Sequence, residues 1–345
     1  MTASATSRSI RSIMNRPRGG QKLNIFTFTT HERYEYNLCK TGHNFYTVNL
    51  PNHKTWDTDY APIPDNYTIL DSIPPYLDFD MVLSHTSCDR LQIAHNILSE
   101  TNIGVLDKLS VPLLRHTHVL PDVRMDVQEQ VKNFQSIPVD RDSFISEFNM
   151  NAWGYTNSNA SFVEHGVDTD FWKPSKSVTK RQNLCLSVVN DWPNRDWCCG
   201  FNLWRETVDG LPVMVVGKSP GFSEPAKSTE DLRNIYQHAK IFYNTSLHSP
   251  VPTVMLEAMA CGCAVVSTAT CMIPEIIKNG ENGFISNDPQ ELKKYLELLL
   301  SDDELAEKMG NNARKTIEER YNLNLFCESW NDLLYSTIEK YEETA

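Results

Sequence analysis

Short apolar runs alternate with longer amphipathic segments along most of the chain. In the first half, apolar runs predict strands at residues 23–29, 45–50, 81–84 and 111–115, and helices ending at residue 40 and spanning 89–106. In the second half, the same pattern predicts strands at 184–189, 212–216, 241–245 and 264–267, and helices at 197–208, 229–239 and from 289 onward. Residues 51–77 are rich in Pro, Asp and Tyr and are predicted to be mostly loop. Strand and helix in alternation predict an α/β protein with parallel sheets and ligands at the carboxyl ends of the strands.

The alternation pauses near residues 166–168, and the charged, proline-containing stretch that follows to residue 182 is typical of a linker. Together with a length of 345 residues, this pause favours two domains. We expect a first domain at 23–165, a second at 166–324, and a last helix at 325–345. That helix is amphipathic and needs a surface to cover, because its apolar side carries Phe326, Trp330, Leu333, Leu334 and Ile338.

Residues 1–22 hold five basic and no acidic side chains. The simplest interpretation is a disordered basic tail, with an organelle transit peptide or a small basic contact arm as the alternatives. Apolar residues make up 40% of the chain and charged residues 22%, as in ordinary globular proteins. No apolar run is long enough to predict a membrane span.

The formal charge of −12 argues against a broad surface for nucleic acid or anionic membranes, although a local basic groove stays open. Nine cysteines occur without a C-x-x-C pair, which argues against a zinc ribbon and a regular disulfide framework. We therefore expect a cytoplasmic protein.

One carboxylate, Glu257, stands in an otherwise apolar stretch at residues 249–266. Pro252 suits the first position of a short helix and Gly262 the position just past its end. The three-and-four spacing places Glu257 beside apolar neighbours, which are Val254, Ala258 and Cys261. An unpaired carboxylate buried there would cost several kcal/mol, so we expect a bound hydroxyl group as its partner.

The start of the same helix favours an anion. The backbone N–H groups of Thr253 and Val254 are unpaired within a helix that begins there, and the positive end of the helix dipole supports them. A ligand with phosphate at one end and a diol at the other fits both features. The segment thus predicts a nucleotide-sugar site.

Three ordered motifs resemble those of the retaining GT-B glycosyltransferases (glycosyl transferases group 1, glycosyltransferase family 4-like). They are Gly-Val-Asp-Thr-Asp-Phe-Trp-Lys-Pro at 166–174, Leu-Glu-Ala-Met-Ala-Cys-Gly at 256–262, and Pro-Glu-Ile-Ile-Lys-Asn-Gly-Glu-Asn-Gly-Phe at 274–284. The resemblance is strong over residues 160–320 and weak before them. It implies two Rossmann-like domains that face each other across a cleft, a nucleotide sugar in the second, and a final helix that crosses back to the first.

The resemblance also implies roles for residues of the second domain. Glu257 matches the second glutamate of the family's E-x7-E motif, which holds the donor ribose, with Pro252, Thr253 and Val254 at the helix start. The first glutamate would fall at position 249, where this chain has Ser249, so a charge beside the transferred sugar is missing. The family holds the diphosphate with an Arg and a Lys; here Asn190-Asp191 replaces the usual Gly-Arg, which leaves Arg195 and, as a second candidate, Lys218.

In the first domain the opening loop lacks the family's glycine pair and carries His31-Glu32-Arg33 instead. We expect these residues to face the cleft as acceptor contacts, with helix capping as the alternative. The histidine that the family places near the donor sugar aligns with His118, with His116 as a rival and His85 as a third candidate.

Taken together, these features predict transfer of a sugar from a UDP- or GDP-sugar to an acceptor hydroxyl with retention of configuration. The acceptor proton would pass to the departing phosphate or to His116 or His118. No metal or other cofactor is expected: no D-x-D motif stands at the family's metal position, and Asp78-Phe79-Asp80 is interpreted as structural.

The expected partners are the donor and a glycan or small-molecule acceptor. The alternatives are a phage-type DNA glycosyltransferase acting on a hydroxymethylated base, a non-catalytic nucleotide-sugar binding protein, and a sugar-nucleotide epimerase.

Overall fold

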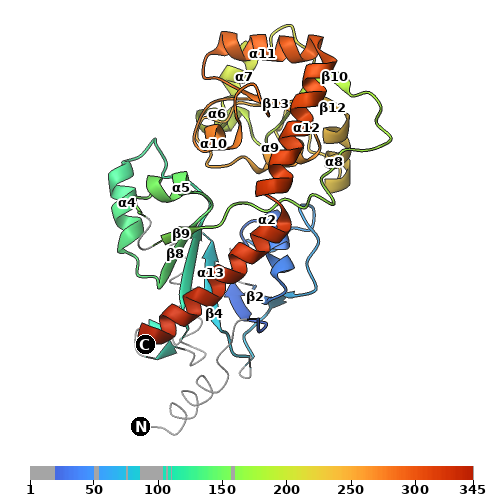
Figure 1. Cartoon of the computed structure of the whole chain (residues 1–345). Coiled ribbons are helices and arrows are strands. Elements are labelled where there is room, and N and C mark those ends of the chain that lie inside the picture. Colours follow the sequence, from blue (N-terminus) through green and yellow to red (C-terminus); the bar gives the residue numbers. More distant parts are fainter. Residues whose placement is uncertain are drawn as a thin grey trace, which may run out of the picture.

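The computed structural model describes residues 20–49, 54–74, 77–85, 104–105, 108–109, 111–156 and 160–344. Its two large sheets lie in separate halves of the molecule, one above the other in Figure 1. All strand pairs within both sheets are parallel, as the alternation of strand and helix predicts. The fold class predicted from sequence, α/β with two doubly wound parallel sheets, is confirmed.

The N-terminal half contains a seven-stranded sheet in the order β3-β2-β1-β4-β7-β8-β9. Its strands are β1 (Asn24–Thr27), β2 (Asn44–Val48), β3 (Tyr67–Leu70), β4 (Met81–His85), β7 (Leu113–Thr117), β8 (Arg141–Phe144) and β9 (Ala160–Phe162). β3 interrupts the segment predicted to be mostly loop. It is an edge strand whose middle residues are exposed, so the sequence shows no clear alternation there.

The helices described in this half are α2 (Glu32–Leu38), α4 (Val127–Ser136) and α5 (Glu147–Ala152), and a 3-10 turn, η1 (Cys39–Thr41), extends α2. The helix predicted at 89–106 lies mostly outside the described residues. Its last part is wrong, because β5 (Gly104–Val105) pairs with β6 (Lys108–Leu109) as a two-residue antiparallel ribbon.

The C-terminal half contains a five-stranded sheet in the order β11-β10-β12-β13-β14. Its strands are β10 (Gln182–Val188), β11 (Val213–Val216), β12 (Ala239–Asn244), β13 (Ala264–Ser267) and β14 (Phe284–Ile285). Its helices are η2 (Pro193–Arg195), α6 (Asp196–Cys199), α7 (Phe201–Thr207), α8 (Thr229–His238), α9 (Thr253–Ala260), α10 (Ile273–Ile276), α11 (Pro289–Ser301) and α12 (Asp303–Arg320). Alternate residues of β12 enter two different cores, so this sheet is covered on both faces.

The single helix predicted at 197–208 is two helices, α6 and α7, which meet at Gly200. This residue has a φ of +62°, and a Cβ atom there would lie 2.2 Å from the carbonyl oxygen of Thr245. Only glycine satisfies both conditions. The break therefore comes from a tertiary contact that the local pattern does not show.

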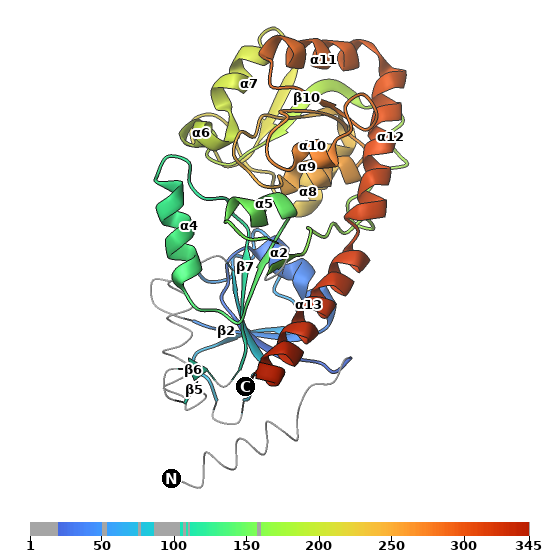
Figure 2. The same ribbon diagram turned by 60° about the vertical axis from the view of Figure 1, so that its left-hand side comes forward.

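The chain passes between the halves twice, and the two passages meet. The N–H of Val167 donates to the carbonyl of Tyr321 at 2.7 Å, and Val167 also forms a bridge with Asn322. From there α13 (Leu323–Thr344) runs back over the N-terminal half, continuing the line of α12 in Figure 2. The predicted crossover helix is confirmed, because all five residues of its apolar side are buried in the N-terminal core.

Tyr34 of α2 is the centre of that core. Its hydroxyl accepts a hydrogen bond from Trp330 Nε1 at 3.1 Å and lies 2.9 Å from His116 Nε2. The other ring nitrogen of His116, Nδ1, lies 3.1 Å from Ser143 Oγ. The ring of Tyr34 also packs against His118 and His165, at centroid distances of 4.4 Å and 5.5 Å.

No helix within the described ranges is both long enough and apolar enough to cross a membrane.

We expect Trp330→Ala to lower the free energy of unfolding by about 3–5 kcal/mol, because it leaves a cavity under α13 and removes the hydrogen bond to Tyr34. Leu325→Ala on the same helix is the control; that side chain is 41% exposed, so we expect a change within about 0.5 kcal/mol. Denaturant unfolding measures both. Equal losses for the two variants would contradict the docking of α13.

We also expect stability to fall in mild acid. Burial lowers the pKa of His116 and His118 far below the usual value and that of His165 to about 3. Below about pH 6.5 the unfolded chain binds these protons and the folded chain does not, so unfolding takes up protons and its free energy drops as the pH drops. Each histidine contributes about 1.4 kcal/mol per pH unit.

His165→Gln isolates the effect of one histidine. Between about pH 6 and pH 5, we expect its free energy of unfolding to depend on pH less steeply than that of the wild type. The difference corresponds to about one proton fewer taken up on unfolding. Buried carboxylates whose pKa is raised, such as Glu35, act in the opposite sense but equally in both proteins. Urea titrations at several pH values measure this dependence. If the free energy of unfolding changes equally steeply with pH in both proteins, His165 is charged in the folded state.

Candidate functional site

Helix α9 carries the predicted donor site and follows β12. It spans Thr253–Ala260, and Gly262 adopts a φ of +78° just past its end, as predicted. Pro252 is the N-cap residue rather than the first helical residue, so the predicted start is one residue early. Within the described part of the chain, no side chain forms a capping hydrogen bond at this end, where the anion site is expected at Thr253 and Val254.

The other end of α9 is firmly held. Arg181 Nη2 donates to the carbonyl of Cys261 at 2.6 Å, and Arg314 Nη1 donates to that of Ala260 at 2.5 Å. Cations at a helix carboxyl end stabilise the helix dipole. Side chains of the C-terminal half therefore hold the carboxyl end of α9, while no side chain of the described residues caps its amino end.

Glu257 is 8% exposed, and its partner comes from the other half of the molecule. Its Oε1 lies 2.9 Å from Nη2 of Arg33, and the hydroxyl of Tyr236 is 3.4 Å from Oε2. Burial raises the pKa of Glu257, and the positive charge of Arg33 opposes this rise. The carboxylate predicted to wait for a ligand hydroxyl is thus paired with a residue predicted to contact the acceptor.

The three residues His31, Glu32 and Arg33 at the start of α2 have different surroundings. His31 caps the helix, since its Nδ1 accepts from the N–H of Tyr34 at 3.3 Å, as the capping alternative predicts for this residue. Glu32 is buried and binds Lys54 Nζ at 2.7 Å. Arg33 alone contacts the C-terminal half, with its guanidinium 5.2 Å from the ring centre of Trp172. Trp172 lies inside a motif that supported the resemblance, but no role was predicted for it from the sequence.

The two histidines predicted for the sugar site differ in position. His116 lies inside β7, is completely buried and has Tyr34 and Ser143 at its two ring nitrogens. His118 follows the last residue of β7, and its Nε2 lies 2.9 Å from Nδ1 of His85. The carboxyl end of a parallel strand is where ligands bind, so the geometry favours His118, with His85 as a neighbour that orients it.

Ser249 lies in the loop between β12 and α9 and is partly buried. Its neighbour His248 has Nε2 2.8 Å from the carbonyl oxygen of Pro121, three residues after His118. The side chains of Arg124 and Trp197 stack nearby across the same boundary, at 3.8 Å. The loops that carry Ser249 and His118 therefore face each other from the two halves.

Arg195 and Lys218, predicted to bind the diphosphate, lie on adjacent loops after β10 and β11. The N–H of Lys218 donates to Asn190 Oδ1, and the N–H of Asp191 donates to the carbonyl of Lys218, both at 2.8 Å. Both side chains are exposed. The structure brings the two cations to one edge of the sheet but records no contact of either with Glu257.

Two further features lie outside this region. Asp80, the last residue of Asp78-Phe79-Asp80, accepts a hydrogen bond from the N–H of Asn24 at 2.7 Å, as a structural role predicts. Among the described residues, no three His, Cys, Asp or Glu side chains gather as metal ligands would.

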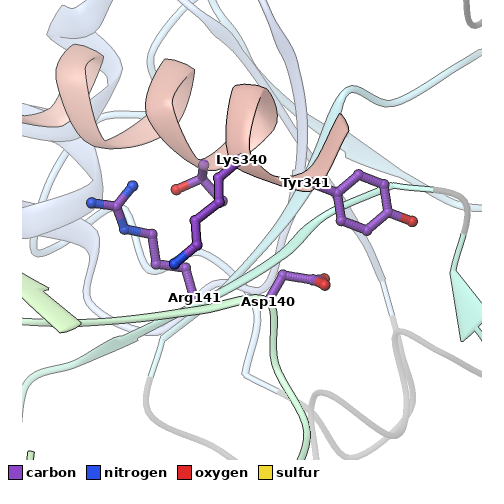
Figure 3. A pocket seen from close by; sticks show the side chains of 5 residues that line it. Asp140, Arg141, Lys340 and Tyr341 are labelled. Carbon is purple, nitrogen blue, oxygen red and sulfur yellow. The ribbon is translucent and has the colours of Figure 1, made fainter. Parts of the chain in front are cut away.

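A small pocket lies between the start of β8 and the end of α13 (Figure 3). Its lining consists of Asp140, Arg141, Thr337, Lys340 and Tyr341. Because β8 begins there, the pocket is at the amino ends of the strands. It is therefore at the opposite edge of the sheet from His118 and does not belong to the site.

Residues 224–316, which include α9, match the protein family described as Glycosyl transferases group 1. N-acetyl-alpha-D-glucosaminyl L-malate synthase of Bacillus anthracis is 31% identical over 155 residues, which are 44% of this chain and 38% of that protein. Sulfoquinovosyl transferase SQD2 of Arabidopsis thaliana is 30% identical over 152 residues, which are 41% of this chain and 28% of that protein. The match thus spans well under half the length of these curated relatives.

Solved structures extend the similarity to the whole fold. Anabaena HepE in complex with UDP-glucose superposes with a TM-score of 0.70 at 14% identity, over 91% of this chain and 99% of that one. Sucrose-phosphate synthase of Thermosynechococcus elongatus gives a TM-score of 0.63 at 14% identity, over 90% and 98%. With its paired parallel sheets and its crossover helix, the chain has the GT-B fold, and the segment around Glu257 is similar to the group 1 glycosyltransferases.

Proposed function

We propose that this chain binds a nucleotide sugar in its C-terminal half and transfers the sugar to a hydroxyl group of an acceptor. The observation that carries the proposal is the buried carboxylate of Glu257 on a helix whose start is uncapped. The carboxylate suits the ribose diol, and the N–H groups of Thr253 and Val254 suit a phosphate. The two features are separated by four helical residues, or about 6 Å, so one nucleotide diphosphate can use both.

The surrounding charges suit the departure of a nucleoside diphosphate. Arg195 and Lys218 on neighbouring loops, and the positive end of α9, would stabilise the negative charge that develops on the leaving group. The transferred sugar would lie near Ser249, which offers one hydroxyl and no charge. Retention of configuration follows from the family resemblance and is part of the proposal, as is catalysis without a metal.

Across the boundary, His118 would bind the acceptor hydroxyl. Burial keeps its pKa far below the usual value, so the imidazole is neutral at physiological pH and can accept a hydrogen bond. The departing phosphate is a second acceptor for the proton.

Anabaena HepE binds UDP and UDP-glucose in its solved structures, which supports a UDP-sugar as the first donor to test. The name of the Bacillus anthracis relative describes a sugar joined to a small molecule, L-malate, which favours a glycan or small-molecule acceptor over DNA.

We expect a UDP- or GDP-sugar to raise the melting temperature of the wild type, and Glu257→Ala to abolish this shift because the ribose loses its acceptor. A ligand at about 100 times its dissociation constant adds roughly 2.7 kcal/mol of stability. Glu281→Ala removes an exposed carboxylate from the same half and should keep the full shift. If Glu257→Ala keeps it as well, the donor site has been placed wrongly.

We expect His118→Ala to lower the rate of sugar transfer by roughly 100-fold or more while donor affinity stays within about twofold of wild type. His238→Ala, on the surface of α8, is the control. Release of nucleoside diphosphate with and without acceptor measures the rate. A wild type that binds the donor but never releases nucleoside diphosphate would instead be a nucleotide-sugar binding protein.

A further inference from the structure

We propose that Arg33, from the N-terminal half, belongs to the donor site. When the nucleotide sugar binds, Arg33 leaves Glu257 and binds the diphosphate. The inference rests on the proposed function. It reassigns Arg33 from the acceptor side, where the sequence placed it, to the donor.

The position of Arg33 supports this role. Its Nη2 lies 2.9 Å from Glu257 Oε1, and its guanidinium lies beside the ring of the buried Trp172. Only 25% of the side chain is exposed. A long, flexible cation is therefore held directly at the carboxylate that would receive the ribose.

One terminal nitrogen of Arg33 has an ion-pair partner but no well-aligned hydrogen bond. This nitrogen, Nη2, is buried and, despite the short distance to Glu257, makes no hydrogen bond of acceptable geometry with any described residue. Other buried or half-buried arginines are well bonded: Arg115 to Asp142 and Phe134, Arg181 to three carbonyl groups, and Arg314 to two. A guanidinium carries five N–H donors in a planar fork that matches phosphate oxygens. The poorly bonded Nη2 of Arg33, beside the carboxylate expected to receive the ribose, therefore suits an anionic ligand.

Both carboxylate oxygens of Glu257 already have partners, which is why a ribose would displace Arg33. One carboxylate oxygen faces Arg33 and the other faces the Tyr236 hydroxyl at 3.4 Å. A ribose diol that binds both oxygens competes with Arg33 for Oε1. The same ligand brings a diphosphate attached to that ribose, so the displaced guanidinium has a stronger anion within reach.

The exchange also couples the two halves. While Arg33 holds Glu257, the start of α2 is tied to α9; when it holds the diphosphate, the donor itself joins them. Donor binding would thus keep the halves together instead of releasing them, with His118 close to the sugar.

The test is calorimetric binding of UDP and GDP, and of uridine and guanosine, to wild type, Arg33→Gln and Arg33→Lys. For the base that binds, we expect Arg33→Gln to weaken the diphosphate by about 10- to 100-fold. The nucleoside without phosphate should bind as well as before or better, because Glu257 is freed. Arg33→Lys keeps the charge but not the planar guanidinium, so its affinity for the diphosphate should lie between those of wild type and Arg33→Gln. It replaces Arg33→Gln in the test if that variant does not fold.

Arg124→Gln is the matched control. It removes another guanidinium that contacts the opposite half, at Trp197, and should leave the affinities for the diphosphate and for the nucleoside unchanged. If Arg33→Gln binds the diphosphate as tightly as wild type, or more tightly, Arg33 is only a contact between the halves and the inference is wrong while the proposed function stands. If wild type binds neither diphosphate, both fail together.

Discussion

A buried carboxylate must have a partner, and much of this structure is arranged around the one at Glu257. It lies among the apolar side chains of α9, where an unpaired charge would cost several kcal/mol. Arg33 supplies the partner from the other half of the molecule. The same ion pair is therefore both the resting state of the proposed donor site and part of the contact between the two halves. Any ligand that satisfies Glu257 must change that contact.

The rest of the C-terminal half keeps α9 in a fixed position. Arg181 and Arg314 bind the carbonyl groups at its end, and α12 packs so closely that a Cβ on Gly310 would lie 2.2 Å from the carbonyl oxygen of Gly262. Helix α9, where the nucleotide would bind, is thus held by close packing and hydrogen bonds. Contacts across the boundary include the stack of Arg124 on Trp197 and the ion pair of Arg320 with Glu164, whose charged side chains are partly exposed. The boundary, where a donor and an acceptor must enter, is held by contacts that can be exchanged.

The sequence predicted what depends on local pattern. The alternation of strand and helix determined the parallel sheets, and the proline and glycine around α9 bounded that helix to within one residue. It did not predict the pairing of Arg33 with Glu257 or of Glu32 with Lys54, since these depend on how distant segments pack. The break at Gly200 has the same origin, because it is imposed by the carbonyl of Thr245. Residue types indicated the chemistry of the site, but only the tertiary structure shows which residue partners which.

The surroundings of His118 limit the chemistry that this residue can perform. Tyr34 and His85 pack against it, and burial together with neighbouring imidazoles keeps its pKa far below the usual value. A base this weak accepts a hydrogen bond readily but does not hold a proton well. In the proposed reaction the diphosphate gains negative charge as the sugar departs, and its oxygen becomes the better proton acceptor. His118 is then suited to orient the acceptor hydroxyl, while the leaving group takes the proton. This division of roles needs no carboxylate at position 249, which is consistent with the serine found there.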